Sequence, residues 1–497
     1  MSLLPRSLSE VHELIPRCKD ADLIELRLDH FFQINFGDIR ALTDRPLIVT
    51  LRVPDEGGFW QGSDEERSGL FQEAIDHGID FIDVEYAHIS DILPRLRLTG
   101  DTKLILSFHT KSSDVDDLLP VLREMFNTPA DVYKLIYTAR GLNDNLMLHP
   151  LVEFARKKGA KFIFHAMGEA GRNSRLLGAL LGNAWTYTSL DNTGETAPGQ
   201  ITLQDARSGY HLDQKTSETG LIGLLGYPVA QSRGWLLHNL LIAGSRQSDL
   251  NEEKPGKDFL YLNFPAQDFD GFWKNWQDKI HGLSITIPHK EKVIPYLSGI
   301  SPSVEASGVC NTAVKHGKHW WGFNTDLLAI QDLLQPYREK LAGGVLVIGT
   351  GATARSSIAA LRQQNIKNIY VTGRNACRGN FLAGKYKATF IPSHEVDQLK
   401  IEVGAVIQTT PVGMYPNSAA LPAGTELLRE GMVALDVVYN PPLTRFLEKA
   451  QKMDCTVIPG EEMFIRQAAK QFELFSGLPV SVEEVRTAWQ KIRKYGE

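Results

Sequence analysis

The chain has 497 residues, of which 43% are hydrophobic and 23% are charged, and its formal net charge is −6. This composition is typical of a globular protein with about three domains at roughly 150 residues each. The mild net charge argues against a surface built for nucleic acid or acidic membranes. No uninterrupted apolar run is as long as a bilayer span, and the first residues lack the apolar core of a signal peptide.

Four cysteines lie far apart in the chain, and none belongs to a Cys-x-x-Cys pair: Cys18, Cys310, Cys377 and Cys455. This spacing indicates neither a disulfide framework nor a structural zinc site. We therefore expect a protein of the reducing cytoplasm, or of a plastid if a transit peptide has been removed, and no bound metal.

Short apolar segments alternate with amphipathic helical segments through the first 200 residues. The eight expected strands are residues 22–29, 47–52, 81–86, 104–109, 132–138, 162–167, 185–190 and 198–202. Apolar residues recur three and four apart in segments between them, such as 65–77, 115–126 and 146–158. The alternation predicts a (β/α)8 TIM barrel whose active site lies at the C-terminal ends of the strands.

Lys134 lies inside an apolar strand segment, Asp-Val-Tyr-Lys-Leu-Ile-Tyr. Burial disfavours the ammonium form, so we expect a lowered pKa and a neutral amine that can attack a ketone and form a Schiff base. His109 ends the preceding strand, where it can act as acid and base. The alternative is a lysine whose amine reaches solvent at the barrel rim, next to a structural histidine.

Charged residues also lie at the ends of two other expected strands. Glu25 and Arg27 occur in Ile-Glu-Leu-Arg-Leu-Asp, and Arg52 is followed by Glu56 in Leu-Arg-Val-Pro-Asp-Glu-Gly-Gly. Either these residues belong to the site or Glu25 and Arg27 form a structural salt bridge.

Taken together, these residues make the first half resemble type I 3-dehydroquinate dehydratase over nearly its whole length. The matching motifs are Glu25-Leu-Arg27, Arg52 with Glu56-Gly57-Gly58, His109, Lys134, Ser174-Arg175-Leu176 and Ala197-Pro198-Gly199-Gln200. The resemblance implies that Lys134 forms an imine with the C3 carbonyl of 3-dehydroquinate. His109 would remove the C2 proton and protonate the departing C1 hydroxyl, with Glu56 orienting it.

The same resemblance implies a set of substrate contacts. Arg175 would bind the substrate carboxylate with its guanidinium fork. The other implied contacts are Glu25, Arg27, Arg52, Thr196 and Gln200. Thr196 stands where the family usually has serine, and because it keeps the hydroxyl we expect little change.

Beyond a polar segment the strongest signal is a glycine loop. The apolar strand Val-Leu-Val-Ile runs into Gly349-x-Gly351-x-x-Ala354 and a helix, a pattern that lets a pyrophosphate approach the helix N-terminus. A purely structural turn is the alternative. The next strand ends at Arg374 and Asn375, where a cation favours the 2′-phosphate of NADP, although a solvated arginine would look the same.

Two further charged residues are candidates for proton transfer. Lys290 ends Thr-Ile-Pro-His-Lys, and Asp326 ends Asn-Thr-Asp. A lysine and an aspartate that meet in a cleft can share the proton that hydride transfer to a ketone requires. Separately, each is more often a surface charge.

These segments together resemble shikimate dehydrogenase from about residue 221 to the C-terminus. The matching motifs are Thr286-Ile-Pro-His-Lys290, Asn311-Thr312, Asn324-Thr325-Asp326, the glycine loop, Thr409-Thr410-Pro-Val-Gly413-Met414, Asp436-Val-Val-Tyr439-Asn440-Pro441 and the segment from Gly460 through Met463 and Gln467 to Ala468. The resemblance implies that Lys290 and Asp326 are the catalytic pair. The implied substrate contacts are Ser232, Thr286, Asn311, Tyr439 and Gln467. The implied cofactor contacts are Gly349, Gly351, Ala352, Thr353, Ala354, Arg374, Asn375, Thr410, Gly413 and Met463.

The two resemblances divide the chain into domains. We expect the dehydratase barrel over 1–207, a solvated linker over 208–220, a substrate domain over 221–326 completed by about 465–497, and a Rossmann-type NADP domain over 327–464. Ser481 and Glu484 predict a capping box at the start of the last helix.

One departure from the dehydrogenase pattern concerns Gly234. The family usually has Ser-Lys-Ser-Pro where this chain has Ser232-Arg233-Gly234-Trp235. The missing hydroxyl removes a hydrogen bond worth about 0.5 to 1.5 kcal/mol and opens a small volume beside C1 of the ring. Because quinate carries a hydroxyl at C1, Gly234 raises the hypothesis that quinate is a substrate; alternatively Arg233 or Trp235 moves to hold the carboxylate of shikimate.

A second departure is Leu327, which follows Asp326 where glycine is common in the family.

Together, the two resemblances predict a bifunctional enzyme that dehydrates 3-dehydroquinate and reduces the product with NADPH. The alternatives are the same dehydratase fused to a quinate/shikimate dehydrogenase, or a sensor that binds quinate or shikimate without turnover. The expected partners are small molecules rather than nucleic acid or membrane, and no oligomeric state is predicted.

Overall fold

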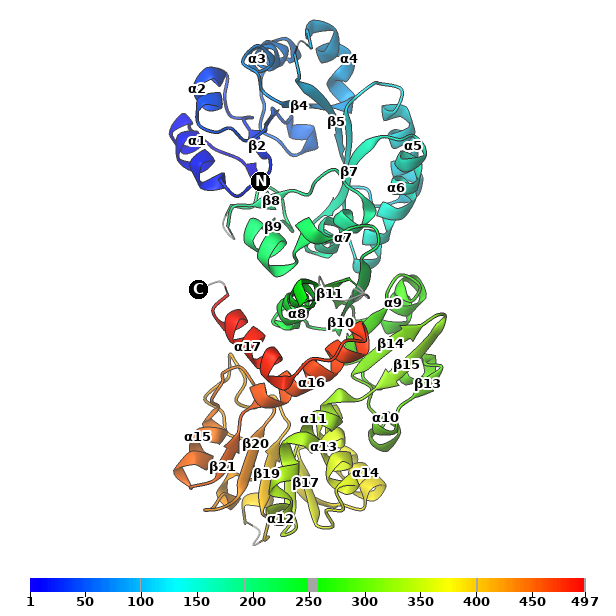
Figure 1. Ribbon diagram of the computed structural model, residues 1–497, viewed down its shortest axis with the longest axis vertical. Coiled ribbons are helices and arrows are strands. Elements are labelled where there is room, and N and C mark those ends of the chain that lie inside the picture. The colour runs from blue at the N-terminus through cyan, green and yellow to red at the C-terminus, as the bar shows by residue number, and fades with distance from the viewer. Residues whose placement is uncertain (99, 192–193, 249–257, 399–400, 496–497) are drawn as a thin grey trace. The chain divides into compact units, whose positions relative to one another are not determined.

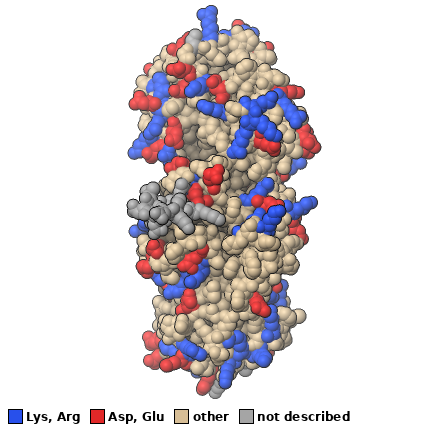
Figure 2. All heavy atoms as spheres, turned by 45° about the vertical axis from the view of Figure 1, so that its right-hand side comes forward, with Lys and Arg blue, Asp and Glu red and all other residues tan. Residues whose placement is uncertain are grey.

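The computed structural model describes residues 1–98, 100–191, 194–248, 258–398 and 401–495. The chain forms two compact units, Met1–Thr219 and Gly220–Glu497. They run from blue to green and from green to red in Figure 1. None of the helices in the described ranges is long and apolar enough to cross a membrane. Basic and acidic side chains are interspersed on the face shown in Figure 2.

The first unit is a curled parallel sheet surrounded by helices. Its main sheet follows chain order through β1 (Ser2–Leu3), β2 (Ile24–Arg27), β3 (Leu47–Thr50), β4 (Phe81–Glu85), β5 (Lys103–His109), β6 (Val132–Thr138) and β7 (Lys161–Met167). A separate two-stranded sheet contains β8 (Thr188–Ser189) and β9 (Ile201–Thr202). The helices are α1 (Leu8–Leu14), α2 (Phe36–Ala41), α3 (Asp64–Asp76), α4 (Ile89–Ile92), α5 (Val115–Met125), α6 (Leu148–Lys157) and α7 (Arg172–Leu181).

The predicted α/β class is confirmed, and the eight predicted strands are present as β2 to β9. The expectation of a fully closed barrel needs a correction. Over the described residues the hydrogen-bonded ladder runs from β1 to β7 and does not continue into β8. β1 was not predicted, because two residues are too few to give a periodic pattern.

The predicted helices of this unit are confirmed as α3, α5 and α6. α3 begins with a capping box in which Ser63 and Glu66 each bond the other's backbone N–H. α5 buries Leu118, Leu122 and Met125, which recur three and four apart and so share one face of the helix.

The segment 208–220, predicted as a solvated linker, belongs to the first unit as far as Thr219. Tyr210 and Leu212 within it are buried. These two apolar side chains fix the segment against the unit, and the polar composition of their neighbours concealed this.

The second unit begins with a mixed six-stranded sheet of order β11-β10-β12-β14-β15-β13. The strands are β10 (Gly220–Gly226), β11 (Phe259–Pro265), β12 (Gly282–Ile285), β13 (Gly299–Ile300), β14 (Thr312–His316) and β15 (His319–Phe323). The helices are α8 (Gly234–Ser248), α9 (Phe269–Trp276) and α10 (Pro302–Ser307).

A second sheet follows, parallel throughout and of order β18-β17-β16-β19-β20-β21. Its strands are β16 (Val345–Ile348), β17 (Ile369–Gly373), β18 (Thr389–Pro392), β19 (Ala405–Gln408), β20 (Val433–Asp436) and β21 (Thr456–Ile458). The helices here are α11 (Thr325–Leu334), α12 (Arg338–Leu341), α13 (Ala352–Gln363), α14 (Ala376–Tyr386) and α15 (Arg445–Lys452). With β16 taken as strand 1, the order of the strands is 3-2-1-4-5-6, which is that of a dinucleotide-binding fold. In this order the chain adds strands first on one side of strand 1 and then on the other.

The last two helices return to the first sheet of this unit. α16 (Gly460–Ser476) and α17 (Val482–Arg493) contact each other and α8, and Phe472 and Trp489 belong to the apolar core around β10. The predicted capping box between Ser481 and Glu484 is confirmed. Leu327 is fully buried in the core beneath the second sheet, which gives this departure from the family pattern a packing role.

Candidate active sites

The first unit contains a cavity of about 550 Å³ whose lining includes the C-terminal ends of β2, β5 and β7. Strand periodicity explains its polar floor. An apolar layer below it joins Ile48, Ile105, Val132 and Ile163 to Tyr187. Side chains two residues apart share a face of a strand, so the next layer along the same strands contains Thr50, Ser107, Lys134 and His165.

Lys134 lies in the middle of β6 with its amine between two carboxylates. Nζ donates to Asp83 Oδ2 at 2.8 Å and to Glu25 Oε1 at 3.3 Å. Burial alone would lower the pKa of Lys134, but Asp83 and Glu25 outweigh burial and raise the pKa above its usual value. The predicted neutral amine is therefore wrong for the resting protein, in which the nitrogen is an ammonium.

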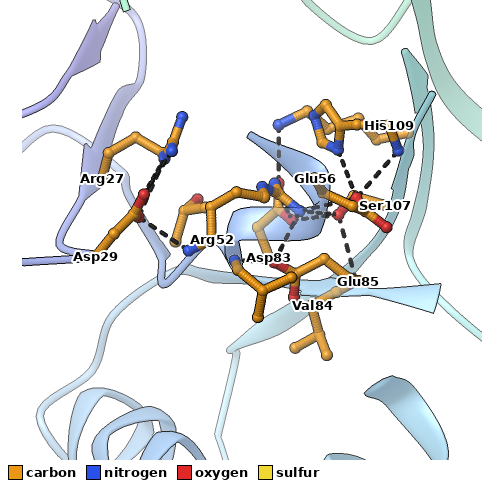
Figure 3. A network of polar contacts seen from close by, with 12 residues as sticks. Arg27, Asp29, Arg52, Glu56, Asp83, Val84, Glu85, Ser107 and His109 are labelled. Carbon is orange, nitrogen blue, oxygen red and sulfur yellow. Dashed lines mark hydrogen bonds and ion pairs between the residues drawn. The ribbon is translucent and has the colours of Figure 1, made fainter. Parts of the chain in front are cut away.

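Arg52 contacts the carboxylates of Asp83 and Glu85 (Figure 3). Its guanidinium contacts Asp83 Oδ1 at 2.7 Å and Glu85 Oε1 at 3.3 Å, and donates to Ser107 Oγ at 2.7 Å. Burial would raise the pKa of Asp83, but Arg52 and Lys134 pull it well below its usual range. Arg52 lines the cavity as expected of a substrate contact, while much of its bonding capacity already serves this network.

His109, at the end of β5, is held by Glu56 from the loop after β3 (Figure 3). Glu56 Oε2 lies 2.8 Å from His109 Nδ1 and also accepts the backbone N–H of His109 at 3.0 Å. Burial and the positive charges of Arg52 and Lys134 keep the pKa of His109 well below its usual value. Burial raises the pKa of Glu56 to about 8 in spite of Arg52. Near neutral pH Glu56 is therefore largely protonated and the His109 imidazole is neutral. Because Nδ1 faces Glu56, His109 Nε2 is the nitrogen that remains for a substrate.

Arg175, in the second turn of α7, is buried and lines the same cavity. Its Nη1 lies 3.4 Å from His165 Nε2, whereas its Nε and Nη2 have no hydrogen-bond partner within the described part of the chain. Burial lowers the pKa of Arg175 to about 10, so the guanidinium stays charged at neutral pH. These donors suit an anion such as a carboxylate.

Two of the predicted substrate contacts lie in the segment before β9 and are linked to Glu25. Gln200 Nε2 donates to Thr196 Oγ1 at 2.9 Å, and Thr196 Oγ1 donates to Ser2 Oγ at 2.9 Å. Ser2 Oγ in turn donates to Glu25 Oε2 at 2.5 Å. This chain of bonds ties the segment to the carboxylate beside Lys134.

The suggested salt bridge between Glu25 and Arg27 is wrong. Arg27 Nε donates to Asp29 Oδ1 at 3.1 Å, and Glu25 contacts Lys134 instead. The reason is geometric: residues two apart on a strand point to the same face, but Glu25 lies deeper in the barrel, level with Lys134.

Sequence reasoning missed Asp83 and Glu85, the carboxylates that set the charge of the site. A usable signal existed, because Phe-Ile-Asp-Val-Glu places two acidic residues two apart in an apolar strand. The argument that singled out Lys134 applies equally to them. Ser2 and Tyr187 carry no comparable signal.

In the second unit, Lys290 and Asp326 meet as predicted. Lys290 Nζ lies 2.6 Å from Asp326 Oδ2, with side chains 14% and 9% exposed. Asn324 caps α11 by accepting the backbone N–H of Leu327 at 3.0 Å, which fixes Asp326 in the first turn, where a carboxylate is favoured.

A buried amide network joins the start of β14 to α16. Asn311 Oδ1 accepts the backbone N–H of Thr325 at 2.8 Å, next to Asp326. Gln471 Nε2 donates to Thr312 Oγ1 at 2.9 Å. Sequence reasoning missed Gln471, although it lies four residues after Gln467 and hence on the same side of α16.

The other predicted substrate contacts of this unit occupy different elements. Thr286 directly follows β12. The Tyr439 ring stacks on Phe464 with 5.0 Å between centroids, and burial raises the pKa of Tyr439. Gln467 Nε2 donates to the carbonyl of Phe464 at 3.1 Å.

Gly234, the first residue of α8, has room for a small side chain. An added Cβ would lie 3.3 Å from Ser232 Oγ and 3.9 Å from Tyr261 Oη. Ser232 Oγ accepts the Gly234 N–H at 3.2 Å. Arg233 Nη1 donates to the carbonyl of Ile492 at 3.1 Å, so holding a substrate carboxylate would require Arg233 to leave this bond.

The glycine loop connects β16 to α13 as predicted. Gly349 has φ +122°, and a Cβ there would lie 2.5 Å from Thr409 Oγ1, so only glycine fits. Nothing lies within 4 Å of a Cβ added at Gly351. Ala352 and Thr353 form the first turn of α13, where backbone N–H groups favour an anion.

The remaining predicted cofactor residues differ in their surroundings. Arg374 is exposed after β17, and Asn375 caps α14 by accepting the backbone N–H of Arg378 at 2.9 Å. Arg378 is a second exposed cation four residues after Arg374 that sequence reasoning did not single out. The others are the fully buried Ala354, the half-buried Thr410, Gly413 with φ +88° and Met463, 7% exposed.

Comparison with protein families divides the chain at the same place as the fold. Residues 1–217 match the family model for type I 3-dehydroquinase. Residues 224–313 match the substrate binding domain of shikimate dehydrogenase, 334–412 match shikimate/quinate 5-dehydrogenase, and 460–488 match the shikimate 5′-dehydrogenase C-terminal domain.

Relatives with curated names cover either the whole chain or its second unit. A chloroplastic bifunctional 3-dehydroquinate dehydratase/shikimate dehydrogenase of Arabidopsis thaliana is 29% identical over 98% of this chain and 81% of its own. A shikimate dehydrogenase (NADP(+)) of Trichormus variabilis is 33% identical over 56% of this chain and 98% of its own. Among solved structures, shikimate 5-dehydrogenase from Thermus thermophilus, in complex with NADP(H) and shikimate, is 26% identical with a TM-score of 0.47 and covers 55% of this chain and 100% of its own. The chain thus belongs to the shikimate dehydrogenase family through its second unit and carries a type I 3-dehydroquinase domain as its first.

Proposed function

We propose that this protein is a bifunctional enzyme that dehydrates 3-dehydroquinate to 3-dehydroshikimate and reduces that product to shikimate with NADPH. The observation that carries the proposal is the amine of Lys134, held between Asp83 and Glu25 in a cavity that His109 also lines. A buried lysine within one strand and a histidine at the end of the neighbouring strand, both lining one cavity, suit Schiff-base chemistry on a small ketone.

Within the first cavity, Lys134 acts as the nucleophile after its ammonium gives one proton to Glu25 or Asp83, the carboxylates that it contacts. His109 acts as the acid and base. The iminium at C3 withdraws electrons from C2, so the neutral imidazole can remove the C2 proton and later return it to the leaving C1 hydroxyl. Glu56 orients the ring through Nδ1 and can pass a proton to it. Arg175, with two guanidinium nitrogens unbonded over the described residues, binds the substrate carboxylate.

The other lining residues hold the substrate ring. Glu25, Arg27, Arg52, Thr196 and Gln200 surround the cavity. Because Thr196 and Gln200 are hydrogen-bonded to Glu25 through Ser2, substrate contact with this segment is coupled to the carboxylate beside Lys134.

In the second unit, Lys290 and Asp326 share the proton that balances hydride transfer. Asn311, hydrogen-bonded to the residue before Asp326, presents its amide to the substrate. Ser232, Thr286, Tyr439 and Gln467 complete the substrate contacts.

NADP(H) fits the residues of the second sheet. Gly349 leaves no space for a side chain at the strand–helix turn, and Gly351 leaves open space before α13. The loop from Gly349 to Ala354 would hold the pyrophosphate, and Arg374 with Asn375 would hold the 2′-phosphate; Thr410, Gly413 and Met463 would lie on the nicotinamide side. When bound, the cofactor supplies the hydride.

The two alternatives, a quinate dehydrogenase and a non-catalytic sensor, are not favoured by the family and relative matches. The substrates are small molecules of the shikimate pathway. A cytoplasmic or plastid location is proposed from the scattered cysteines, which are all free.

The test is to supply the protein with 3-dehydroquinate and NADPH and to follow enone absorbance and NADPH consumption together. We expect the enone to appear first, NADPH to fall after it, and shikimate to accumulate in equal amount. Absence of the enone would contradict the proposed dehydration. An enone that persists while NADPH is not consumed would contradict the proposed reduction.

A further inference from the structure

Tyr187 presents the face of its ring to the reactive nitrogen of the first unit. It directly precedes β8, is 4% exposed, and its ring centroid lies 4.4 Å from Lys134 Nζ. A cation at this distance over an aromatic face is attracted by the ring quadrupole, most strongly where water is excluded.

Tyr187 also divides two cavities. The substrate cavity has Tyr187 and Glu25 in its lining. A second cavity of about 370 Å³ has the same two residues in its lining, together with Trp185 and Thr188. Tyr187 and Glu25 therefore form the wall between the substrate cavity and this rear cavity, where the ladder stops short of β8.

The charge on the nitrogen is the same before and after it reacts with a ketone. An ammonium and a ketone give a protonated imine and one water: nitrogen bonds to the carbonyl carbon, the carbonyl oxygen leaves with two protons from nitrogen, and one proton and the positive charge stay on nitrogen. Groups that stabilise a cation at this point, namely Asp83, Glu25 and the Tyr187 ring, act on both states.

We propose that Tyr187 is a positioning residue of the dehydratase site: its ring holds the Lys134 nitrogen as a cation through the iminium stage and shields it from the rear cavity. This inference rests on the proposed Schiff-base function. The ring face carries the effect, and the phenolic hydroxyl is not required for it.

The shielding has a kinetic consequence. Water that reaches the iminium carbon before the C2 proton is removed returns the substrate unchanged. A side chain that leaves the rear cavity open to the nitrogen therefore lowers the fraction of enzyme present as iminium during turnover, and lowers kcat more than it raises KM.

The experiment uses the full chain with phenylalanine at position 187 carrying zero, one, two or more ring fluorines, which weaken the quadrupole while the shape is nearly kept. The readouts are kcat and KM for 3-dehydroquinate and the amount of Lys134 adduct trapped by borohydride during turnover. Reduction of 3-dehydroshikimate in the second unit serves as the internal control for intact protein.

We expect Y187F to keep most of the wild-type kcat and adduct, and successive fluorines to lower both in steps. Y187L should lower kcat by about tenfold to thirtyfold and the trapped adduct with it. A fluorine series with constant kcat and adduct overturns the inference even if Y187L is inactive or unfolded. Wild-type protein that turns over substrate without a trapped adduct overturns the proposed Schiff base itself, which is a separate outcome.

Discussion

The two lysines proposed for catalysis lie in opposite kinds of surroundings. Lys134 is 5% exposed and contacts two carboxylates, Glu25 and Asp83, and Arg52 contacts the second of them as well as Glu85. Lys290 has a side chain 14% exposed and, among the residues that the structure describes, one carboxylate partner, Asp326 at 2.6 Å. One site is a dense buried network of charges, and the other is a single ion pair bordered by amides.

The difference matches the chemistry proposed for each lysine. A nitrogen that becomes an iminium remains a cation for most of the cycle, so a buried site must supply permanent counter-charge. A nitrogen that only passes a proton alternates between charged and neutral, and one aspartate at a helix N-terminus suffices. The expectation that burial would make Lys134 neutral considered only the lysine and omitted its partners.

The largest effects should come from removing either lysine. We expect K134A to reduce dehydration to background and leave reduction intact, and K290A to lower reduction by about 10² to 10⁴-fold while dehydration stays. K134A should also cost roughly 3 to 5 kcal/mol of stability in the first unit, because Glu25 and Asp83 lose a buried partner, and K290A should cost less. Activity assays and thermal unfolding measure both; loss of both activities in either variant would contradict independent sites.

Substitutions of Arg175 separate the effect of its charge on activity from the effect of its charge on stability. R175M should lower kcat/KM for 3-dehydroquinate by about a hundredfold, because charge-assisted hydrogen bonds to the substrate carboxylate are lost. It should also raise the melting temperature, because a buried guanidinium with two nitrogens unbonded over the described residues is removed.

The matched control is R175K, which keeps the charge without the planar fork. It should retain only part of the activity and none of the gain in stability. Full activity in R175M would remove Arg175 from the substrate site.

Much of the fold was accessible from sequence, whereas part of each site was not. Alternation of strands and helices, the glycine loop and the capping box at Ser481 are local patterns that a few residues specify. The contact of Lys134 with Asp83 joins residues 51 positions apart, and no local period encodes it. Closure of the barrel failed as a prediction for a related reason, because pairing between the first and last strands depends on geometry accumulated over the whole sheet.

Position in the sequence is also a poor guide to the partner of a charged side chain. Glu25 and Arg27 are close in sequence, which suggested a salt bridge, but each bonds elsewhere. Lys290 and Asp326 were placed together only through resemblance to a family, and their contact at 2.6 Å confirms that they meet.

The pH dependence of the melting temperature tests whether Glu56, in the first unit, is protonated in the folded protein. Burial raises the pKa of Glu56 to about 8, so the folded protein keeps a proton that the unfolded chain releases near pH 4.3, about the usual value for Glu. This group therefore costs progressively more stability as the pH rises from about 4.3 to about 8. E56Q removes that cost, so its melting temperature should gain on the wild type between pH 5 and pH 8.

In the same variant, dehydration at neutral pH should fall by about tenfold, because glutamine still bonds His109 but cannot exchange a proton with it. Reduction in the second unit should not change. A difference in melting temperature that is constant with pH would mean that Glu56 is ionised in the folded protein.

The smallest effect should come from G234S in the substrate site of the second unit. The added Cβ lies 3.3 Å from Ser232 Oγ and 3.9 Å from Tyr261 Oη, so the side chain fits with a small shift. A second hydroxyl beside Ser232 should lower KM for shikimate by about twofold to tenfold, the value of one hydrogen bond. G234A fills the same space without a hydroxyl, so equal KM values for the two variants would show that the hydroxyl does not contact the substrate. Rates of quinate oxidation complete the comparison. If the space beside Gly234 admits the C1 hydroxyl of quinate, both variants should oxidise quinate more slowly relative to shikimate than the wild type does. If the wild type does not oxidise quinate, the hypothesis that this space admits quinate is wrong.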